Sequence, residues 1–137
     1  MGTLTLSQAQ TLLSQGLELM RQYPGKAACL SVCDQYGFLL SFTRMDGAPV
    51  RSIQIAQQKA YTCARIGTNT NAFLERLRTE NIPVSYFCDD QLTALPGGAV
   101  LQDPQGNMVG GVGVSGLAPH EDQAIADALA SALANGQ

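Results

Sequence analysis

The sequence is poor in the residues on which most catalytic sites depend. It has one histidine, His120, and its four cysteines include no C-x-x-C pair. No Ser-His-Asp, Cys-His or zinc-ligand spacing can be assembled, so no catalytic constellation is visible and no metal site is predicted. Because no histidine precedes position 120, a histidine-ligated site in the first predicted helix or in the strands is excluded.

Charged residues are also scarce. They make up 14% of the chain, with eight basic and eleven acidic residues and a net charge of −3. No basic run occurs, so the electrostatic footprint that nucleic-acid binding requires is missing. A surface with so little charge predicts that part of it is covered by other copies of the chain, and we expect a homo-oligomer.

Long hydrophobic runs are missing as well. No stretch approaches the ~20 apolar residues of a membrane span, and the first ten residues lack the basic and apolar regions of a signal peptide. The four cysteines lie in apolar contexts typical of buried free thiols. We therefore expect a cytoplasmic protein in a reducing compartment, without a membrane partner.

The residue patterns predict one α+β domain over residues 1–137. A helix should run from Ser7, in a capping box with Gln10, to Tyr23. The other expected elements are strands at Ala27–Cys33 and Phe38–Arg44, both covered on two faces, a helix from Ser52 as its cap to Ile66, a helix at Asn71–Glu80, a short extended segment at Tyr86–Cys88, a hairpin of residues 99–102 and 108–115, and a last helix from Pro119 that buries Ile125, Ala128, Leu129, Ala132 and Leu133.

Glycine is abundant in one stretch, Leu95–Gly116, which holds seven of the 14 glycines. Its end matches the G-x-G-x-x-G pattern of dinucleotide-binding loops. Such a site needs a second parallel strand after the helix, and the sequence has one helix only beyond the motif. Glu121 and Asp122 also place negative charge at the start of that helix, where they would repel a phosphate. Nucleotide binding is therefore not expected.

Gly111 and Gly113 leave one face of the predicted strand without side chains. Either a helix or a flat ligand can lie against such a backbone. The helix that carries Ala56, Ala60 and Ala64 has the small side chains that a close approach requires, and we expect it to fill this position.

The motifs together resemble those of the GlcG/HbpS family of haem-degrading or haem-binding domains. RMDGAP at residues 44–49 is followed in order by Gln58-Lys59-Ala60, LPGGAVL, VGGVGVSG and Glu121-Asp122. The chain is also similar to the C-terminal domain of PduO-type proteins. The resemblance implies a profilin-like fold with a five-stranded antiparallel sheet, and association into dimers or larger rings. It further implies that the ligand is haem in some members, while others belong to glycolate, propanediol or glycerol operons.

The polar residues of these motifs are the candidate site. Arg44 is suited to bind a carboxylate or a haem propionate, and Lys59 to add a point charge. Alternatively, Arg44 and Asp46 hold the turn and Lys59 pairs with a carboxylate. His120 or Met45 would ligate haem iron. The full set of candidate ligand-binding residues is Arg44, Met45, Asp46, Lys59, Gly111, Gly113, Ser115, His120, Glu121 and Asp122.

Three functional hypotheses follow. The first is an accessory protein that binds a small ligand or a tetrapyrrole, either haem or a corrinoid. The second is an enzyme, or an accessory subunit of one, in glycolate, diol, glycerol or cobalamin metabolism. The third is a purely structural oligomeric partner of a larger enzyme.

Overall fold

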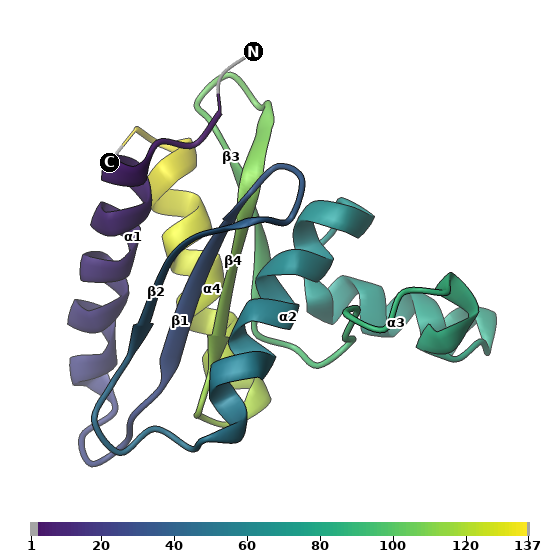
Figure 1. Cartoon of the computed structure of the whole chain (residues 1–137), viewed down its shortest axis with the longest axis horizontal. Helices are drawn as coiled ribbons and strands as arrows, with labels where there is room; N and C mark the ends of the chain where they lie inside the picture. The colour runs from purple at the N-terminus through teal and green to yellow at the C-terminus, as the bar shows by residue number, and fades with distance from the viewer. Residues whose placement is uncertain (1–2, 137) are drawn as a thin grey trace.

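The computed structural model describes residues 3–136, which form a four-stranded antiparallel sheet with helices on both faces (Figure 1). The strand order is β2-β1-β4-β3. In chain order the elements are α1 (Leu6–Leu19), the 3-10 turn η1 (Met20–Gln22), β1 (Cys29–Asp34), β2 (Leu39–Arg44), α2 (Arg51–Ile66), α3 (Thr70–Glu80), the 3-10 turn η2 (Val84–Phe87), β3 (Gly98–Gln102), β4 (Met108–Ser115) and α4 (Pro119–Ala134).

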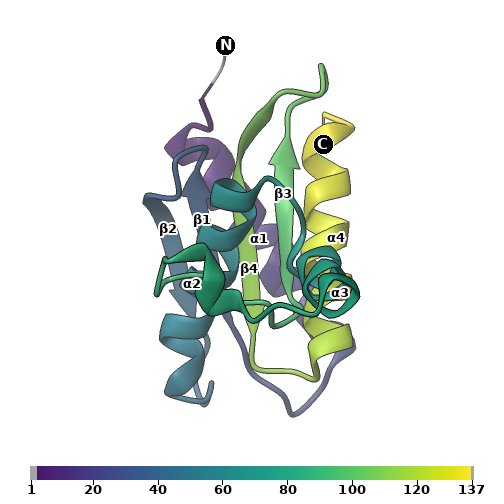
Figure 2. The same cartoon turned by 90° about the vertical axis from the view of Figure 1, so that its right-hand side faces the viewer.

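The helices form two unequal layers around the sheet. Helices α1 and α4 cover one face, and α2 lies on the other, with α3 beyond it towards the β3 edge (Figure 2). The main core fills the space between the sheet and the α1–α4 layer, and its largest fully buried apolar side chains include Leu12, Leu30, Leu101 and Leu129. Burial of such side chains supplies most of the driving force for folding. Within residues 3–136, no helix is long and apolar enough to cross a membrane.

The bare glycine face of β4 is filled by α2, as the sequence predicted. A methyl group at Gly111 would collide with the carbonyl oxygen of Ala60, and one at Gly113 with that of Ala56. The small side chains of α2 and the missing side chains of β4 therefore allow the two backbones to touch. The alternative, a flat ligand against Gly111 and Gly113, is wrong because the helix occupies this space.

The prediction of five strands is wrong: the sheet of the described residues has four. Tyr86 and Phe87, expected to be extended, lie instead in η2, and Cys88 directly after it has a left-handed backbone with φ 57°. The outer edge of β3 is already satisfied by side chains. The backbone N–H groups of Gly98 and Val100 each donate over 2.8 Å, to Thr70 Oγ1 and Asn69 Oδ1 respectively. No neighbouring strand is needed there.

Three expected helix features also differ. The capping box of α1 joins Thr5 to Gln8, two residues earlier than predicted, and the helix gives way to η1 after Leu19. Helix α2 begins at Arg51, and Ser52 does not cap it. The buried side of α4 includes Asp122, Gln123 and Ala126, whereas Ala128 is exposed.

Strand β2 is the open edge of the sheet. It pairs only with β1, and its side chains are half-buried or exposed. The expectation that both N-terminal strands are covered on two faces therefore holds for β1 alone.

Candidate functional site

Lys59 and Asp122, two of the candidate residues, form a buried ion pair that joins α2 to α4. Lys59 Nζ lies 3.2 Å from Asp122 Oδ2, and the two side chains are 0% and 4% exposed. Lys59 also donates to the carbonyl oxygen of Val114 over 2.7 Å. The second carboxylate oxygen of Asp122 accepts the backbone N–H of Leu117 over 3.0 Å. Lys59 therefore pairs with a carboxylate of its own chain, the second of the two roles considered for it.

The protonation of this pair is governed by burial. Desolvation lowers the pKa of Lys59 and raises the pKa of Asp122, and in each case the opposite charge of the partner opposes the shift. Neither group reaches solvent, so neither can meet a ligand from solution.

Ser115 lies at the end of β4 and is also enclosed. Its hydroxyl donates to Ser52 Oγ over 3.1 Å, and both side chains are buried. The position of Ser52 explains why it does not cap α2: its side chain points to the sheet. Ser115, Lys59 and Asp122 thus fasten α2 and α4 to β4.

The RMDGAP segment supplies a turn and one half-buried side chain that packs on the core. Met45 packs on the main core, and its sulfur accepts the backbone N–H of Ala28 over 3.4 Å. That sulfur faces the protein, so Met45 is a poor iron ligand. Arg44 and Asp46 are exposed, and no ion pair within residues 3–136 joins them. Gly47 provides the positive φ of the turn, 83°.

Glu121 caps the start of its own helix. Its Oε1 accepts the backbone N–H of Ala118 over 3.1 Å and the ammonium group of Lys26 over 3.3 Å. The Ala118 N–H, and after it the Lys26 charge, hold the pKa of Glu121 below its usual value. This carboxylate is therefore ionised and engaged.

His120 is the candidate residue that remains exposed beside a cavity. The cavity is a groove of about 740 Å³ between α3 and α4, closed on one side by the segment that leads into β3. We call it the His120 groove. Its lining comprises Asn71, Leu74 and Arg78 of α3, Leu95 and Pro96 of the segment, and Pro119, His120, Gln123, Ala124 and Asp127 of α4. None of Arg44, Met45 or Asp46 lies in it.

The floor of the His120 groove is fixed by Gln123. The side-chain oxygen of this residue accepts the Gly97 N–H over 2.7 Å, and its nitrogen donates to Gly98 O and to Asp127 Oδ1, each over 2.9 Å. Gln123 therefore ties the LPGG segment, residues 95–98, to α4. The walls combine apolar groups, such as Leu74 and Leu95, with the Arg78 guanidinium.

Sequence reasoning did not select Arg78 or Gln123. Arg78 belongs to a polar helix whose charges look like an ordinary solvated face. The contacts by which Gln123 holds the segment before β3 have no local signal, because Gly98 and Gly97 lie 25 and 26 residues away. The LPGG motif was recognised, but its contact with α4 is a property of the fold.

The buried cysteines do not add a metal site. Burial raises the pKa of Cys33 to about 12 and raises the pKa of Cys29 and Cys63, so these thiols stay protonated near neutral pH. Among residues 3–136, no three His, Cys, Asp or Glu side chains are grouped so that they could hold a metal ion.

Comparison with known proteins gives matches over nearly the whole chain. A family model described as haem degrading protein HbpS-like matches residues 4–131. A 15.0 kDa protein of the dhaT-dhaS intergenic region in Citrobacter freundii is 31% identical over 129 residues, which are 91% of this chain and 88% of that protein.

Solved structures share the fold. A double mutant of HbpS from Streptomyces reticuli has a TM-score of 0.85 at 27% identity, over 97% of this chain and 88% of that one. The PduOC:haem complex has a TM-score of 0.84 at 23% identity, over 96% of this chain and 95% of that one. Both carry the α+β arrangement described above.

Proposed function

The chain belongs to the family of haem-degrading, HbpS-like proteins, and from this membership we propose that it is an accessory protein that binds haem in the His120 groove. The observation that carries the choice of site is the position of His120. It is the one histidine of the sequence, it is exposed, and it lines a groove with apolar walls. Histidine is a common axial ligand of haem iron.

The chemistry of the groove fits the two parts of a haem molecule. Leu74, Leu95, Pro96 and Ala124 offer apolar surface to the macrocycle. Arg78, at the α3 side of the same groove, can bind a propionate through two parallel hydrogen bonds. His120 would hold the iron of a bound haem, and the haem would supply the oxygen chemistry of its iron.

Titration of the purified protein with haemin tests this proposal. We expect a shifted Soret band at micromolar protein. The matched variants are Arg78→Gln and Arg44→Gln, which remove one exposed arginine each. Arg78→Gln should weaken binding by roughly three- to tenfold through the loss of a charge-assisted contact, whereas Arg44→Gln should leave it unchanged. Equal effects of the two variants would contradict the proposed groove. A cobalamin titration, followed by its own absorption, tests the corrinoid alternative.

We further propose that copies of the chain associate through the β2 edge. Phe38 and Leu39 are 64% and 53% exposed at the start of this strand. Residues 39–43 carry no charge and no proline, the usual protections of an open strand edge. An antiparallel pairing of β2 with its symmetry mate would satisfy both edges and cover both apolar patches.

The free thiols support a reducing environment, and we propose that the protein works in the cytoplasm. Cys29, Cys33 and Cys63 are buried and unbridged, and Cys88 is exposed and unbridged. Exposed thiols persist where the compartment keeps them reduced.

A further inference from the structure

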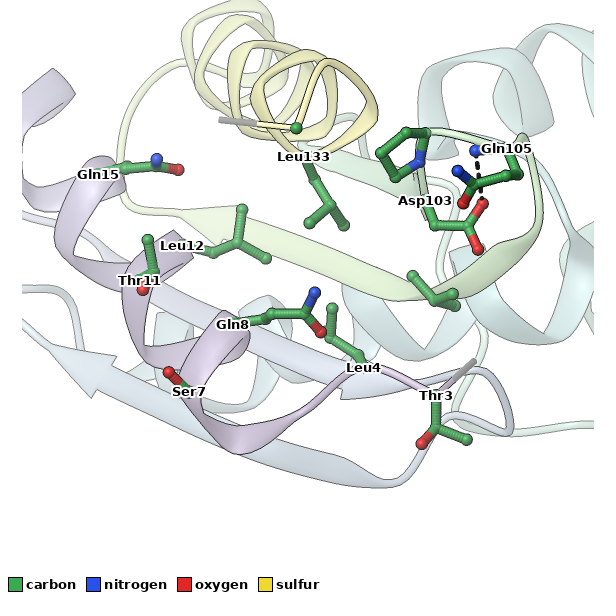
Figure 3. Close-up of a pocket in the computed structure, with 13 residues that line it drawn as sticks. Thr3, Leu4, Ser7, Gln8, Thr11, Leu12, Gln15, Asp103, Gln105 and Leu133 are labelled. Atoms are coloured by element: carbon green, nitrogen blue, oxygen red, sulfur yellow. Dashed lines mark hydrogen bonds between the residues drawn. The ribbon is translucent and has the colours of Figure 1, made fainter. Parts of the chain in front are cut away.

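A second cavity lies between α1 and the end of α4, and none of the candidate ligand-binding residues lines it. It has a volume of about 460 Å³ and is bounded by the start of α1, the turn between β3 and β4, and the C-terminal end of α4 (Figure 3). We call it the α1 groove. No residue of the His120 groove lines it.

The middle of the α1 groove is apolar. Leu12 of α1 and Leu133 of α4 face each other across it (Figure 3), and Leu4 and Val109 also line it. All four side chains are at least nine-tenths buried and belong to the main core. The groove therefore exposes the rim of the core, and a ligand with an apolar middle section would cover it.

A buried acceptor lacks a partner at one end of the groove. Gln15 Oε1 is buried, and no hydrogen-bond donor within residues 3–136 reaches it. Figure 3 shows the Gln15 side chain extending from α1 towards the groove. A buried acceptor without a donor is destabilising, so a bound molecule that supplies an O–H or N–H group would gain from this position.

A hydrogen-bond donor, the side-chain nitrogen of Gln8, also lines the groove. The capping box fixes Gln8, because its Oε1 accepts the Thr5 N–H over 2.9 Å. Its side-chain nitrogen makes no hydrogen bond among the described residues and is left to donate. Gln8, Leu12 and Gln15 follow the i, i+4, i+7 spacing of one helix face, and the two glutamines are separated by a rise of about 10.5 Å along the axis.

The described lining of the groove offers no positive charge to an anionic ligand. Its lining includes no lysine, arginine or histidine. The one carboxylate, Asp103, is engaged by its own turn: it accepts the N–H groups of Gln105 and Asn107. The Asn107 N–H, first among these groups, holds the pKa of Asp103 below its usual value. An anion would meet this carboxylate with no compensating lysine, arginine or histidine among the lining residues that the structure describes.

From this arrangement we propose that the α1 groove is a second ligand site, for an uncharged, elongated molecule with a hydrogen-bonding group at each end and an apolar middle. A terminal diol of four to six carbons has this chemistry. One hydroxyl would donate to Gln15 Oε1, the other would accept from Gln8 Nε2, and the carbon chain would lie on Leu12 and Leu133. The site is independent of haem binding, and the carboxylates of haem do not suit it.

Nuclear magnetic resonance of the full-length protein, titrated with hexanediol bearing terminal hydroxyls, tests the proposal. For so small a ligand we expect millimolar affinity. The shifts should be confined to α1, α4 and the side-chain amides of Gln8 and Gln15. Ethanediol, which is too short to reach both glutamines, and hexanedioate, which is charged, should bind at least fivefold more weakly.

The matched variants are Gln15→Leu and Gln10→Leu, both on α1. Gln10 is exposed and does not line the groove. Gln15→Leu should weaken hexanediol binding at least fivefold and Gln10→Leu should not. If Gln15→Leu does not fold, the unsubstituted protein still tests the proposal, because hexanediol should change the chemical shift of the Gln8 side-chain amide. The proposal would be overturned by chemical-shift changes scattered over the protein or by equally tight binding of hexanedioate. It would also be overturned if hexanediol caused no chemical-shift changes, because a water molecule alone would then satisfy Gln15.

Discussion

The buried Lys59–Asp122 pair shows how a polar motif can serve the fold rather than a ligand. An ion pair removed from water is tolerated when both partners are fully hydrogen-bonded, and here Val114 and Leu117 complete the arrangement. The loss of one partner leaves the other charge buried and unpaired. The pair therefore behaves as a clamp between α2 and α4.

Replacement of Lys59 by methionine should lower the free energy of unfolding by about 3–5 kcal/mol, because Asp122 then remains uncompensated. Chemical denaturation measures this change. Adding Asp122→Leu should recover most of the loss. As a control, Arg76→Met breaks an ion pair with Glu80 whose partners are both 48% exposed, and it should cost about 0.3–0.5 kcal/mol. A Lys59→Met variant as stable as Arg76→Met would refute the clamp.

The sequence alone predicted some of these residue roles and missed others. Lys59 was recognised as a candidate for carboxylate pairing, but its partner was not identified, because Asp122 lies 63 positions later. His120, Arg44 and Asp46 are exposed, and no ion pair within residues 3–136 joins Arg44 to Asp46 to hold the turn. The engagement of Ser115 by Ser52 was missed, since a serine near a helix start usually caps that helix.

At the scale of elements, the contact between α2 and β4 depends on glycine. Gly111 and Gly113 admit backbone atoms of the helix where any side chain would stand. Cys33 lies under the same helix, and its thiol donates to the carbonyl oxygen of Ala60 over 3.3 Å. Cys63, on the helix itself, is fully buried. The rate at which reagents reach these thiols therefore reports how closely α2 packs on the sheet.

Gly113→Ala should displace α2 from the sheet and make Cys33 and Cys63 reactive. The rate of labelling by a thiol reagent measures this: in the unsubstituted protein we expect one fast thiol, the exposed Cys88, and slow buried ones. Gly25→Ala is the control, because Gly25 has a positive φ of 78° but open space around it. That variant pays backbone strain of about 1–2 kcal/mol and should leave labelling unchanged. Slow labelling in both variants would contradict the close α2–β4 contact.

The elements themselves were largely predictable, and the exceptions have physical reasons. The helices and the two hairpins follow periodicity and turn signals, which are local. The expected fifth strand failed because the β3 edge is closed by Asn69 and Thr70, a contact between distant parts of the chain. The start of α1 was misplaced because two capping sequences overlap there, and the capping box forms between Thr5 and Gln8.

At the scale of the whole molecule, the match to the HbpS-like family confirms the resemblance that the motifs predicted. The similarity to PduO-type proteins is reflected in the shared fold of PduOC. The sequence motifs identified the family. In the structure the same motifs form the Lys59–Asp122 clamp, the contact of Gly111 and Gly113 with α2, and the segment of residues 95–98. The motifs identified less of the His120 groove. Its walls include residues of α3, which come close to α4 only in the folded chain.

The proposed association of two copies through β2 gives a prediction at the same scale. Leu39→Lys places a charge at the open edge and should shift the assembly towards the monomer, as seen by analytical ultracentrifugation. Val50→Lys adds the same charge at a residue that is 72% exposed and lies outside the strand, and it should leave the assembly intact. An unchanged size for Leu39→Lys would place the interface elsewhere.

The most direct test of the central claim is haemin titration of the unsubstituted protein beside His120→Ala, followed by the Soret band. We expect a shifted band for the unsubstituted protein and binding weakened roughly tenfold or more for His120→Ala, because the variant loses the bond from the protein to iron. Gln15→Leu, in the α1 groove, should behave as the unsubstituted protein. No shifted band at micromolar protein, or a band that His120→Ala leaves intact, would contradict haem binding in the His120 groove.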